Sequence, residues 1–373
     1  MIRRRDSVSQ GSSLPRARRR RSGRRWGRSG MMAAYAAVAF LLARTAPCPQ
    51  LPEGWQPLHA PTPQTAAPTN TDALPGTLAD DAQAAYRFPE APRLVALGDV
   101  HGNLPATRKA LQMAGAIDAA GNWAGGELVL VQVGDQLDRG SDERQLLDWF
   151  KRLGDQAEAA GGAFHVLNGN HEAMNVAGDY HSVTPSGLLA FAGFLPRTED
   201  TAAVFSHRIV AHGRAAAFMP GCQYARLLAE HNAIIVVGTT LFVHGGLLPQ
   251  HVDYGIGRIN SEIRRWMSGG EKTPPRSVYT KDSPLWTRYY SASQPTQEVC
   301  STLARVLSAV GATRMVVGHT IQEHGINSAC DGRLYRIDVG VSGTFGGDPQ
   351  LLEITRHGVQ VLADSPALAM GAN

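Results

Sequence analysis

The sequence has few cysteines and no closely spaced pair of them. Its four cysteines, at positions 48, 222, 300 and 330 of 373 residues, include no Cys-x-x-Cys spacing. Zinc fingers and thioredoxin-like redox sites depend on such pairs, so both classes are excluded. Two alternatives remain for Cys300 and Cys330, which could form a disulfide in an exported protein or stay as two ordinary buried thiols.

The sequence also lacks a long hydrophobic run. Its clearest apolar stretch, residues 31–43, has 13 residues, which is short for a membrane span and suits a signal-peptide core. We therefore interpret residues 1–46 as a basic leader with an apolar signal-like segment and expect an exported, periplasmic protein without a stable membrane span. Translation could instead start at Met31 or Met32, and the protein would be cytoplasmic if this segment is not a functional signal.

The positive charge is confined to the N-terminus. Residues 1–30 contain eleven of the 36 basic residues and one of the 32 acidic ones, which leaves 25 basic against 31 acidic residues, a net charge of −6, in the rest. An arginine block can bind nucleic acid, but the apolar run directly after it favours an export signal. No nucleic-acid partner is expected.

Composition divides the remainder of the chain. Residues 47–85 begin with eight prolines in 29 residues and are predicted to be a Pro-rich disordered linker. A catalytic domain is predicted over 86–365, followed by a tail over 366–373. Within the domain, residues 178–235 have Gly, Pro, His and Ala-rich helical patches without a motif, and we interpret them as a cap-like insertion.

Short apolar runs alternate with helical stretches, as in an α/β domain. The pattern predicts strands at 94–97, 128–133, 164–167, 241–243, 315–317 and 334–337. Ser141, Asp142 and Glu143 predict a helix start with a hydroxyl cap, and the expected buried face consists of Leu146, Leu147, Phe150 and Leu153. Because ligands bind beyond the carboxyl ends of strands in open α/β sheets, we expect the six strand ends to converge on one site.

Polar motifs follow these strands. They are Gly98-Asp99-Val100-His101-Gly102-Asn103, Gly134-Asp135-Gln136-Leu137-Asp138-Arg139-Gly140, Gly169-Asn170-His171-Glu172, Val243-His244-Gly245-Gly246 and Gly318-His319-Thr320. Asp, Asn and His supply the oxygen and imidazole ligands that suit Mn²⁺, Fe or Zn²⁺. Each motif alone is a weak signal, whereas five in this order indicate a metal site.

In this order the motifs resemble the calcineurin-like metallophosphoesterases, specifically the phosphoprotein phosphatase branch, over about residues 90–360. Residues 175–179 (Asn-Val-Ala-Gly-Asp) and 283–288 (Ser-Pro-Leu-Trp-Thr-Arg) are similar to those of the bacterial-type Shewanella-like protein phosphatases. The resemblance implies an α/β fold of two mixed β-sheets sandwiched between helices, with the metals at one rim.

The resemblance also implies roles for individual residues. Asp99, His101 and a bridging Asp135 would hold one divalent metal, and Asp135, Asn170, His244 and His319 the other. His171, oriented by Asp138, would protonate the leaving group, and Arg139 and Arg288 would clamp the phosphoryl oxygens. Glu172 would support its turn, and no chemistry is assigned to Asp338-Val-Gly340. Mn²⁺ is the preferred metal, with Fe and Zn²⁺ as alternatives.

The implied activity is that of a metal-dependent phosphomonoesterase, a serine/threonine or tyrosine protein phosphatase. It would act on a phosphorylated protein or a small phosphomonoester by in-line attack of a hydroxide that bridges the two metals. A phosphodiesterase or dinucleotide polyphosphate hydrolase is the alternative on the same site. An inactive metal-binding scaffold is a third class, and it is disfavoured because every expected ligand is present.

Overall fold

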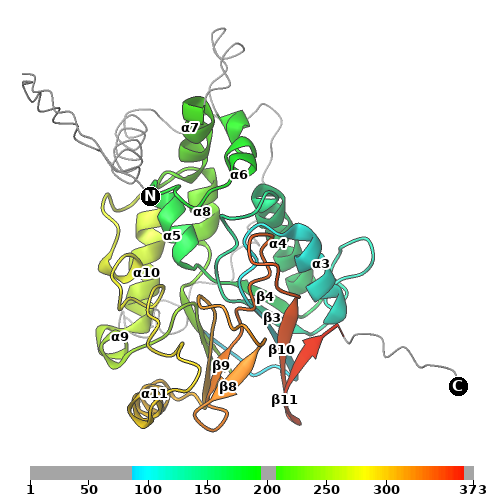
Figure 1. Ribbon diagram of the computed structural model, residues 1–373, viewed down its shortest axis with the longest axis vertical. Coiled ribbons are helices and arrows are strands. Elements are labelled where there is room, and N and C mark those ends of the chain that lie inside the picture. The colour runs from blue at the N-terminus through cyan, green and yellow to red at the C-terminus, as the bar shows by residue number, and fades with distance from the viewer. Residues whose placement is uncertain (1–85, 195–206, 365–373) are drawn as a thin grey trace, which may run out of the picture.

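The computed structural model describes residues 86–194 and 207–364, which form two β-sheets packed face to face with helices outside them (Figure 1). One sheet has six strands in the order β1-β5-β6-β7-β9-β8, and the other has five in the order β11-β10-β2-β3-β4. Both contain parallel and antiparallel pairs. The predicted pair of mixed sheets is confirmed. The predicted leader 1–46, the linker up to residue 85 and the tail 366–373 lie outside the described residues.

The six predicted strands are confirmed to within one residue at each end. They are β2 (Arg93–Leu97), β3 (Val129–Gln132), β4 (Ala163–Val166), β6 (Thr240–Val243), β7 (Arg314–Val317) and β9 (Leu334–Arg336). The predicted strands do not include β1 (Arg87–Phe88), β5 (Ile234–Val237), β8 (Asn327–Ala329), β10 (Gln350–Thr355) and β11 (Gly358–Ala363). Strands β1 and β8 are only two or three residues long and β11 is largely exposed, so these three lack the apolar run of a buried strand, whereas β5 and β10 are buried and apolar and the prediction omits them.

An apolar layer fills the space between the sheets. Its buried side chains come from both inner faces and include Ala96, Val131, Phe242, Val316 and Ile337. Because side chains alternate along a strand, the opposite faces of the same strands are free to pack against helices. Both sheets are therefore covered on their two faces, which explains their continuous apolar runs.

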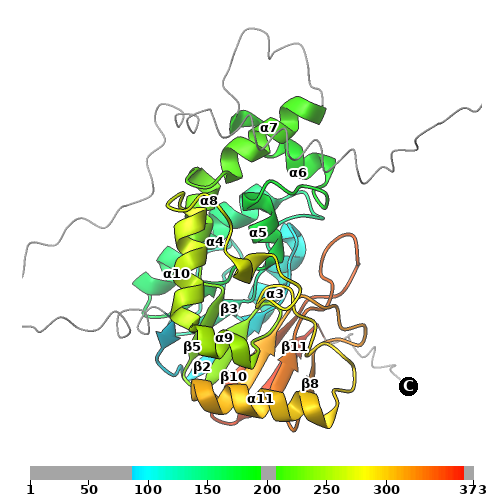
Figure 2. The same cartoon turned by 90° about the vertical axis from the view of Figure 1, so that its left-hand side faces the viewer.

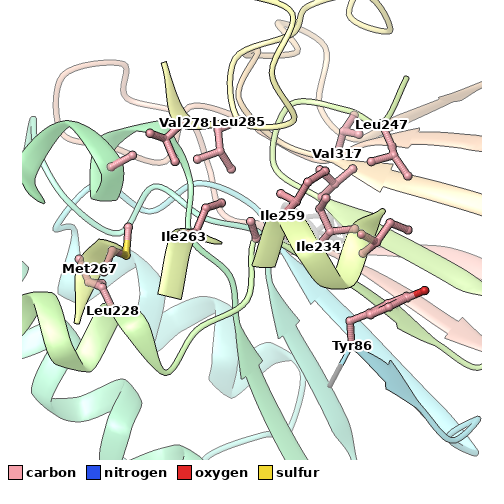
Figure 3. Close-up of a cluster of buried hydrophobic side chains, with 14 of the residues drawn as sticks. Tyr86, Leu228, Ile234, Leu247, Ile259, Ile263, Met267, Val278, Leu285 and Val317 are labelled. Atoms are coloured by element: carbon pink, nitrogen blue, oxygen red, sulfur yellow. The ribbon is translucent and has the colours of Figure 1, made fainter. Parts of the chain in front are cut away.

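Helices α3 (Leu104–Met113) and α4 (Glu143–Ala159) pack on the outer face of the five-stranded sheet. The predicted buried residues of α4 are all buried, although its N-cap is Asp142, whose side chain makes no capping hydrogen bond, rather than Ser141. The outer face of the six-stranded sheet is covered by α8 (Gln223–Ala229), α10 (Ile256–Met267) and α11 (Gln297–Val310). Figure 3 shows part of that core, where Ile259 and Ile263 of α10 lie near Ile234 of β5.

The predicted insertion is helical where it is described. It contains α6 (Pro185–Leu189), a 3₁₀ turn η1 (Ala192–Phe194), α7 (His207–Phe218) and α8, and strand β5 begins at Ile234. Helices α6 and α7 lie at the end of the molecule opposite α11 in both views (Figures 1 and 2). The insertion follows α5 (Asn170–Val176), the helix that begins with the third motif, so it is attached directly to the candidate site.

A disulfide joins Cys300 in α11 to Cys330 in the turn between β8 and β9. Their Cα atoms are 5.3 Å apart, within the usual range for a disulfide. Of the two alternatives for this pair, the structure contains the disulfide. None of the helices that the structure describes is long and apolar enough to cross a bilayer, and the predicted apolar segment 31–43 is not among the described residues.

Candidate metal centre

The motif residues meet where strands from both sheets end. Strands β2, β3 and β4 are parallel, as are β6, β7 and β9 in the other sheet, so each set of carboxyl ends lies on one edge. The two edges touch, because the backbone N–H of His319, after β7, donates to both carboxylate oxygens of Asp99, after β2, at 3.2 Å. The expected convergence is therefore found, from segments 220 residues apart.

The glycines of the motifs allow this close approach. A Cβ atom on Gly169 would overlap the carboxylate of Asp135, and one on Gly318 would overlap that of Asp99. Only glycine lets a backbone pass so near another side chain. The motifs thus contain both the acids and the glycines that leave space for them.

Backbone strain is concentrated at the site. Seven described non-glycine residues have positive φ, and five of them are predicted site residues: His101, Asp135, Asp138, Arg139 and His319, with φ between 43° and 68°. Each such residue costs on the order of 1–3 kcal/mol and persists only where the surrounding structure imposes it. The fold therefore holds these side chains in fixed positions at a cost to stability.

Asp135 lies at the centre of the cluster. Its Oδ2 atom is 3.3 Å from Nε2 of His244 and 3.8 Å from Nε2 of both His101 and His171. Its Oδ1 atom accepts a hydrogen bond from the backbone N–H of His171 at 3.0 Å. This position agrees with the bridging role that the resemblance implies for Asp135.

The other predicted ligands surround it. Oδ1 of Asn170 is 2.9 Å from Nε2 of His244, and Nδ1 of His244 is 4.0 Å from Oδ1 of Asp99. The ligand atoms of Asp135, His244 and His319 lie within 4.8 Å of one another. The structure thus brings together all six residues predicted as metal ligands. The same spacing joins His101, Asp135 and His171, so geometry alone also permits His171 to be a ligand.

The histidines present nitrogen lone pairs to the site. Nδ1 of His101 is 2.8 Å from the carbonyl oxygen of Leu137, and Nδ1 of His244 is 2.9 Å from that of Val133. A carbonyl only accepts, so the proton belongs on Nδ1 in both rings and Nε2 is left for a metal. Nε2 of His319 is buried without a hydrogen-bond partner. Such an orphaned buried nitrogen fits the role of a metal ligand.

The pKa values of two histidines, His101 and His319, agree with metal binding, whereas Asp135 outweighs burial and raises the pKa of His244. Burial lowers the pKa of His101 to about 4, and burial together with the neighbouring His244 lowers the pKa of His319 to about 3. Both rings are therefore neutral near pH 7, which is the form that binds metals. Burial would raise the pKa of Asp135, but His244 and His171 hold it well below its usual value, so this acid is ionised.

Buried acids outnumber cations here. Burial, followed by the charges of Asp338 and Asp135, raises the pKa of Asp99 well above its usual value. Divalent cations would remove that repulsion, and the oxygen and imidazole donors fit Mn²⁺, Fe and Zn²⁺. Asp338 is a site residue that sequence reasoning missed; it is 3% exposed, and burial raises its pKa to about 6. The available signal was its position directly after the strand run 334–337.

Glu172 supports the turns, as predicted. Its carboxylate accepts hydrogen bonds from the backbone N–H groups of Asp135, Gln136 and Leu137 and from that of Gly169, at 2.7–3.1 Å. One side chain thereby ties the β3 turn to the β4 turn. Glu172 fixes the backbone on which Asp135 and Asn170 stand.

His171 and Asp138 form a close pair. Nδ1 of His171 is 2.6 Å from Oδ2 of Asp138, and both side chains are buried. Burial would lower the pKa of His171, yet Asp135 and Asp138 raise it above its usual value. The ring therefore favours the protonated form, which a general acid requires.

The two predicted phosphate ligands differ in exposure. Arg139 is half-buried, with Nη1 at 3.2 Å from Nε2 of His101 and its guanidinium carbon 4.9 Å from the ring centre of Phe345. Arg288 is exposed and donates from Nη1 to Oγ1 of Thr320, the residue after His319, at 3.0 Å. Both guanidinium groups lie beside predicted metal ligands. Sequence reasoning missed a third arginine, Arg214 of α7, which is fully buried and contacts Asp138.

Comparisons with known proteins agree with this geometry. A family model described as "Calcineurin-like phosphoesterase" matches residues 92–323. The chain is 39% identical over 311 residues to "Shewanella-like protein phosphatase 2" of Arabidopsis thaliana, covering 75% of this chain and 80% of the relative. It is 26% identical over 280 residues to "Shewanella-like protein phosphatase 1" of Plasmodium berghei, covering 72% and 74%.

Among solved structures, a cold-active protein-tyrosine phosphatase of a psychrophilic Shewanella species superposes with a TM-score of 0.59 at 24% identity, covering 80% of this chain and 89% of that one. A second structure of a cold-active protein tyrosine phosphatase gives a TM-score of 0.61 at 23% identity, covering 79% and 84%. At this identity the match establishes the shared fold alone.

Proposed function

Because the chain belongs to the calcineurin-like phosphoesterase family, we propose that this hydrolase of phosphoric esters is a metal-dependent protein phosphatase that acts on phosphomonoesters. The observation that carries the proposal is the arrangement around Asp135, where ligand nitrogens and a paired His171 face one carboxylate and the Arg139 guanidinium lies beside His101. The names of the similar proteins support a phosphorylated protein as the substrate, since they include a protein phosphatase and a protein-tyrosine phosphatase.

Two divalent ions are the proposed cofactors. Asp99, His101 and Asp135 would hold one, and Asp135, Asn170, His244 and His319 the other. Ions bound there would lower the pKa of a coordinated water and neutralise charge on the phosphoryl oxygens. We take Mn²⁺ as the first metal to test, with Fe and Zn²⁺ as alternatives, because the donor set accommodates each.

Arg139 would bind the phosphoryl group. Its planar guanidinium offers parallel donors to two oxygens and stabilises charge that grows in the transition state. The Phe345 ring lies against it, and Oγ1 of Thr344 donates to the Arg139 carbonyl at 3.2 Å, so the 341–347 loop limits where this side chain can point. Arg288 would provide a second, more exposed contact.

His171 would donate a proton to the departing oxygen. Its Nδ1 is occupied by Asp138, which leaves Nε2, on the Asp135 side of the ring, as the donor atom. Asp138 has no exposed surface, so it fixes the ring orientation and stabilises the charged imidazolium. In this role the residue acts on the leaving group and need not be a metal ligand.

Hydrolysis of phosphopeptides, p-nitrophenyl phosphate and bis-p-nitrophenyl phosphate, with and without Mn²⁺, tests the proposal. We expect monoester turnover that requires metal and falls in His171→Asn. Preference for the diester would favour the phosphodiesterase alternative. Inactivity with Mn²⁺, Fe and Zn²⁺ in turn would contradict both, and phosphoserine, phosphothreonine and phosphotyrosine peptides compared side by side would define the substrate.

Export to an oxidising compartment is a second part of the proposal. It is supported by the Cys300–Cys330 disulfide, since such bonds persist outside the reducing cytosol, and by the apolar segment 31–43. Fractionation of a bacterial host that expresses the full chain, beside a variant lacking residues 31–43, tests it. The full chain should reach the periplasm and the deletion variant should not; equal cytoplasmic retention of both would contradict the proposal.

A further inference from the structure

Arg214 connects the predicted insertion to the catalytic pair. It lies in α7 and its side chain has no exposed surface. Nη2 donates to Oδ1 of Asp138 at 3.1 Å, and Nη1 contacts the carboxylate of Glu143. The guanidinium therefore forms ion pairs with two buried acids that lie outside the insertion, 71 and 76 residues away in the chain.

The same guanidinium is held in place from the insertion. Its carbon lies 5.1 Å from the ring centre of Phe191 and 5.2 Å from that of Phe218, and Nη1 donates to the carbonyl of Gly187 at 3.0 Å. All three partners come from the helical patches around α6 and α7. The insertion thus holds the guanidinium in place, and the guanidinium in turn contacts Asp138, the partner of His171.

Asp138 divides its two oxygens between these neighbours. Oδ2 faces Nδ1 of His171 at 2.6 Å, and Oδ1 accepts from Arg214 and, at 2.9 Å, from Nδ2 of Asn175. Asn175 completes the hydrogen-bond network. Its Oδ1 accepts from Nε of Arg214 at 2.7 Å, and its Nδ2 donates to the backbone carbonyl of His171 at 2.9 Å. The hydrogen bonds from Arg214 and Asn175 to Oδ1 therefore oppose rotation of the Asp138 carboxylate away from His171.

We infer that Arg214 is a positioning residue for the general acid: through Asp138 it fixes the His171 ring with Nε2 toward the leaving group, so proton donation depends on a docked insertion. The inference rests on the proposed function, in which His171 protonates the departing oxygen. Arg214 itself touches no ligand atom of the metal site among the contacts described. Its effect is therefore expected on the step that needs the proton, and not on metal content.

Two aryl phosphates separate this role from a purely structural one. The phenol that leaves phenyl phosphate is less acidic than p-nitrophenol, so its departure needs the proton more. The measurement is the ratio of kcat values for phenyl and p-nitrophenyl phosphate with the Mn²⁺-loaded full chain, together with metal content and Tm. In Arg214→Gln we expect the ratio to fall by roughly tenfold, a fraction of the ~10²–10⁴-fold that general acid catalysis contributes.

Glu143→Gln is the matched control. It removes the other acidic partner of Arg214 but keeps the contact with Asp138, so it should lower Tm while retaining the wild-type ratio. Arg214→Lys keeps the charge without the planar fork and should give an intermediate ratio. Because Arg214→Gln leaves the buried carboxylate of Glu143 without a cation, Arg214→Lys decides the question if the glutamine variant does not accumulate as folded protein.

The outcomes distinguish the inference from the proposed function. A wild-type ratio in the Arg214 variants, with a lowered ratio in His171→Asn, would overturn the inference and leave the phosphatase proposal intact. A wild-type ratio in His171→Asn as well would overturn the acid role and the inference, although monoester hydrolysis would still stand. Absence of hydrolysis by the metal-loaded wild-type chain would overturn both.

Discussion

The strand-end loops and the helical insertion differ in how far their buried charges are paired with opposite charges. The loops place Asp99, Asp135 and Asp338 together with few cationic partners and hold His101 and His319 in strained backbone conformations. In the insertion, Arg214 is buried and its single positive charge is paired with the carboxylates of Asp138 and Glu143. Unneutralised groups held rigidly suit a metal centre, whereas a fully paired cation acts by position. The first region supplies the chemistry, and the second aligns it.

The largest test of this contrast is Asp135→Asn. Since this carboxylate lies at the centre of the loops, its loss should prevent stable binding of the metals, whose charge stabilisation is worth several kcal/mol, about 10³-fold or more in rate. We expect p-nitrophenyl phosphate hydrolysis to fall by at least that factor and the metal content per chain, measured by mass spectrometry, to fall with it.

The exposed acid Asp253 provides the control, because Asp253→Asn removes one formal charge away from the site. Its activity and metal content should equal those of the wild type. If Asp135→Asn lost activity while binding as much metal as the wild type, Asp135 would not have the bridging role that its position indicates.

His171→Asn tests the boundary between the two regions. The ring follows β4 but is oriented by Asp138, which Arg214 holds. As the proposed acid, it should contribute about 10²–10³ in kcat, within the usual range for such groups, without changing metal content. A parallel loss of metal would show instead that His171 is a ligand, which the 4.8 Å cluster of His101, Asp135 and His171 also permits.

The contrast also separates what sequence could predict from what it could not. Asp99 and Asp135 follow apolar strands within Gly-Asp motifs, and Gly318 and Gly169, which make room for their carboxylates, belong to two of the other motifs, so the set of motifs predicts them. Arg214 is in no motif, and its partner Asp138 is 76 residues away, so its role exists only after the insertion docks. The Cys300–Cys330 pairing likewise depends on how α11 meets the β8–β9 turn.

Asp338 lies between the residues that motifs predict and those whose role depends on docking, and its substitution should have a smaller effect. It occupies the strand-end position after β9, yet a lone acid followed by Val-Gly carries no motif information. Its charge raises the pKa of Asp99 and would favour a bound cation. We expect Asp338→Asn to weaken Mn²⁺ affinity by about 10–100-fold, as for residues that support metal ligands. A high Mn²⁺ concentration should then restore the activity of this variant. Unchanged Mn²⁺ titration would place Asp338 outside the site.

The smallest expected effect is that of Phe345→Leu, which tests whether the rim contributes to alignment as the insertion does. The ring of Phe345 is 45% exposed and lies 4.9 Å from the Arg139 guanidinium carbon. An exposed cation–π contact is worth about 0.5–1 kcal/mol, so KM for p-nitrophenyl phosphate should rise by about 2–5-fold while kcat stays constant. Tyr279→Leu, which removes an exposed aromatic beside the 3₁₀ turn η3 (Arg276–Val278), is the matched control and should change neither constant. A fall in kcat instead would mean that Phe345 orients Arg139 for the transition state, and that alignment is shared between the insertion and the 341–347 loop.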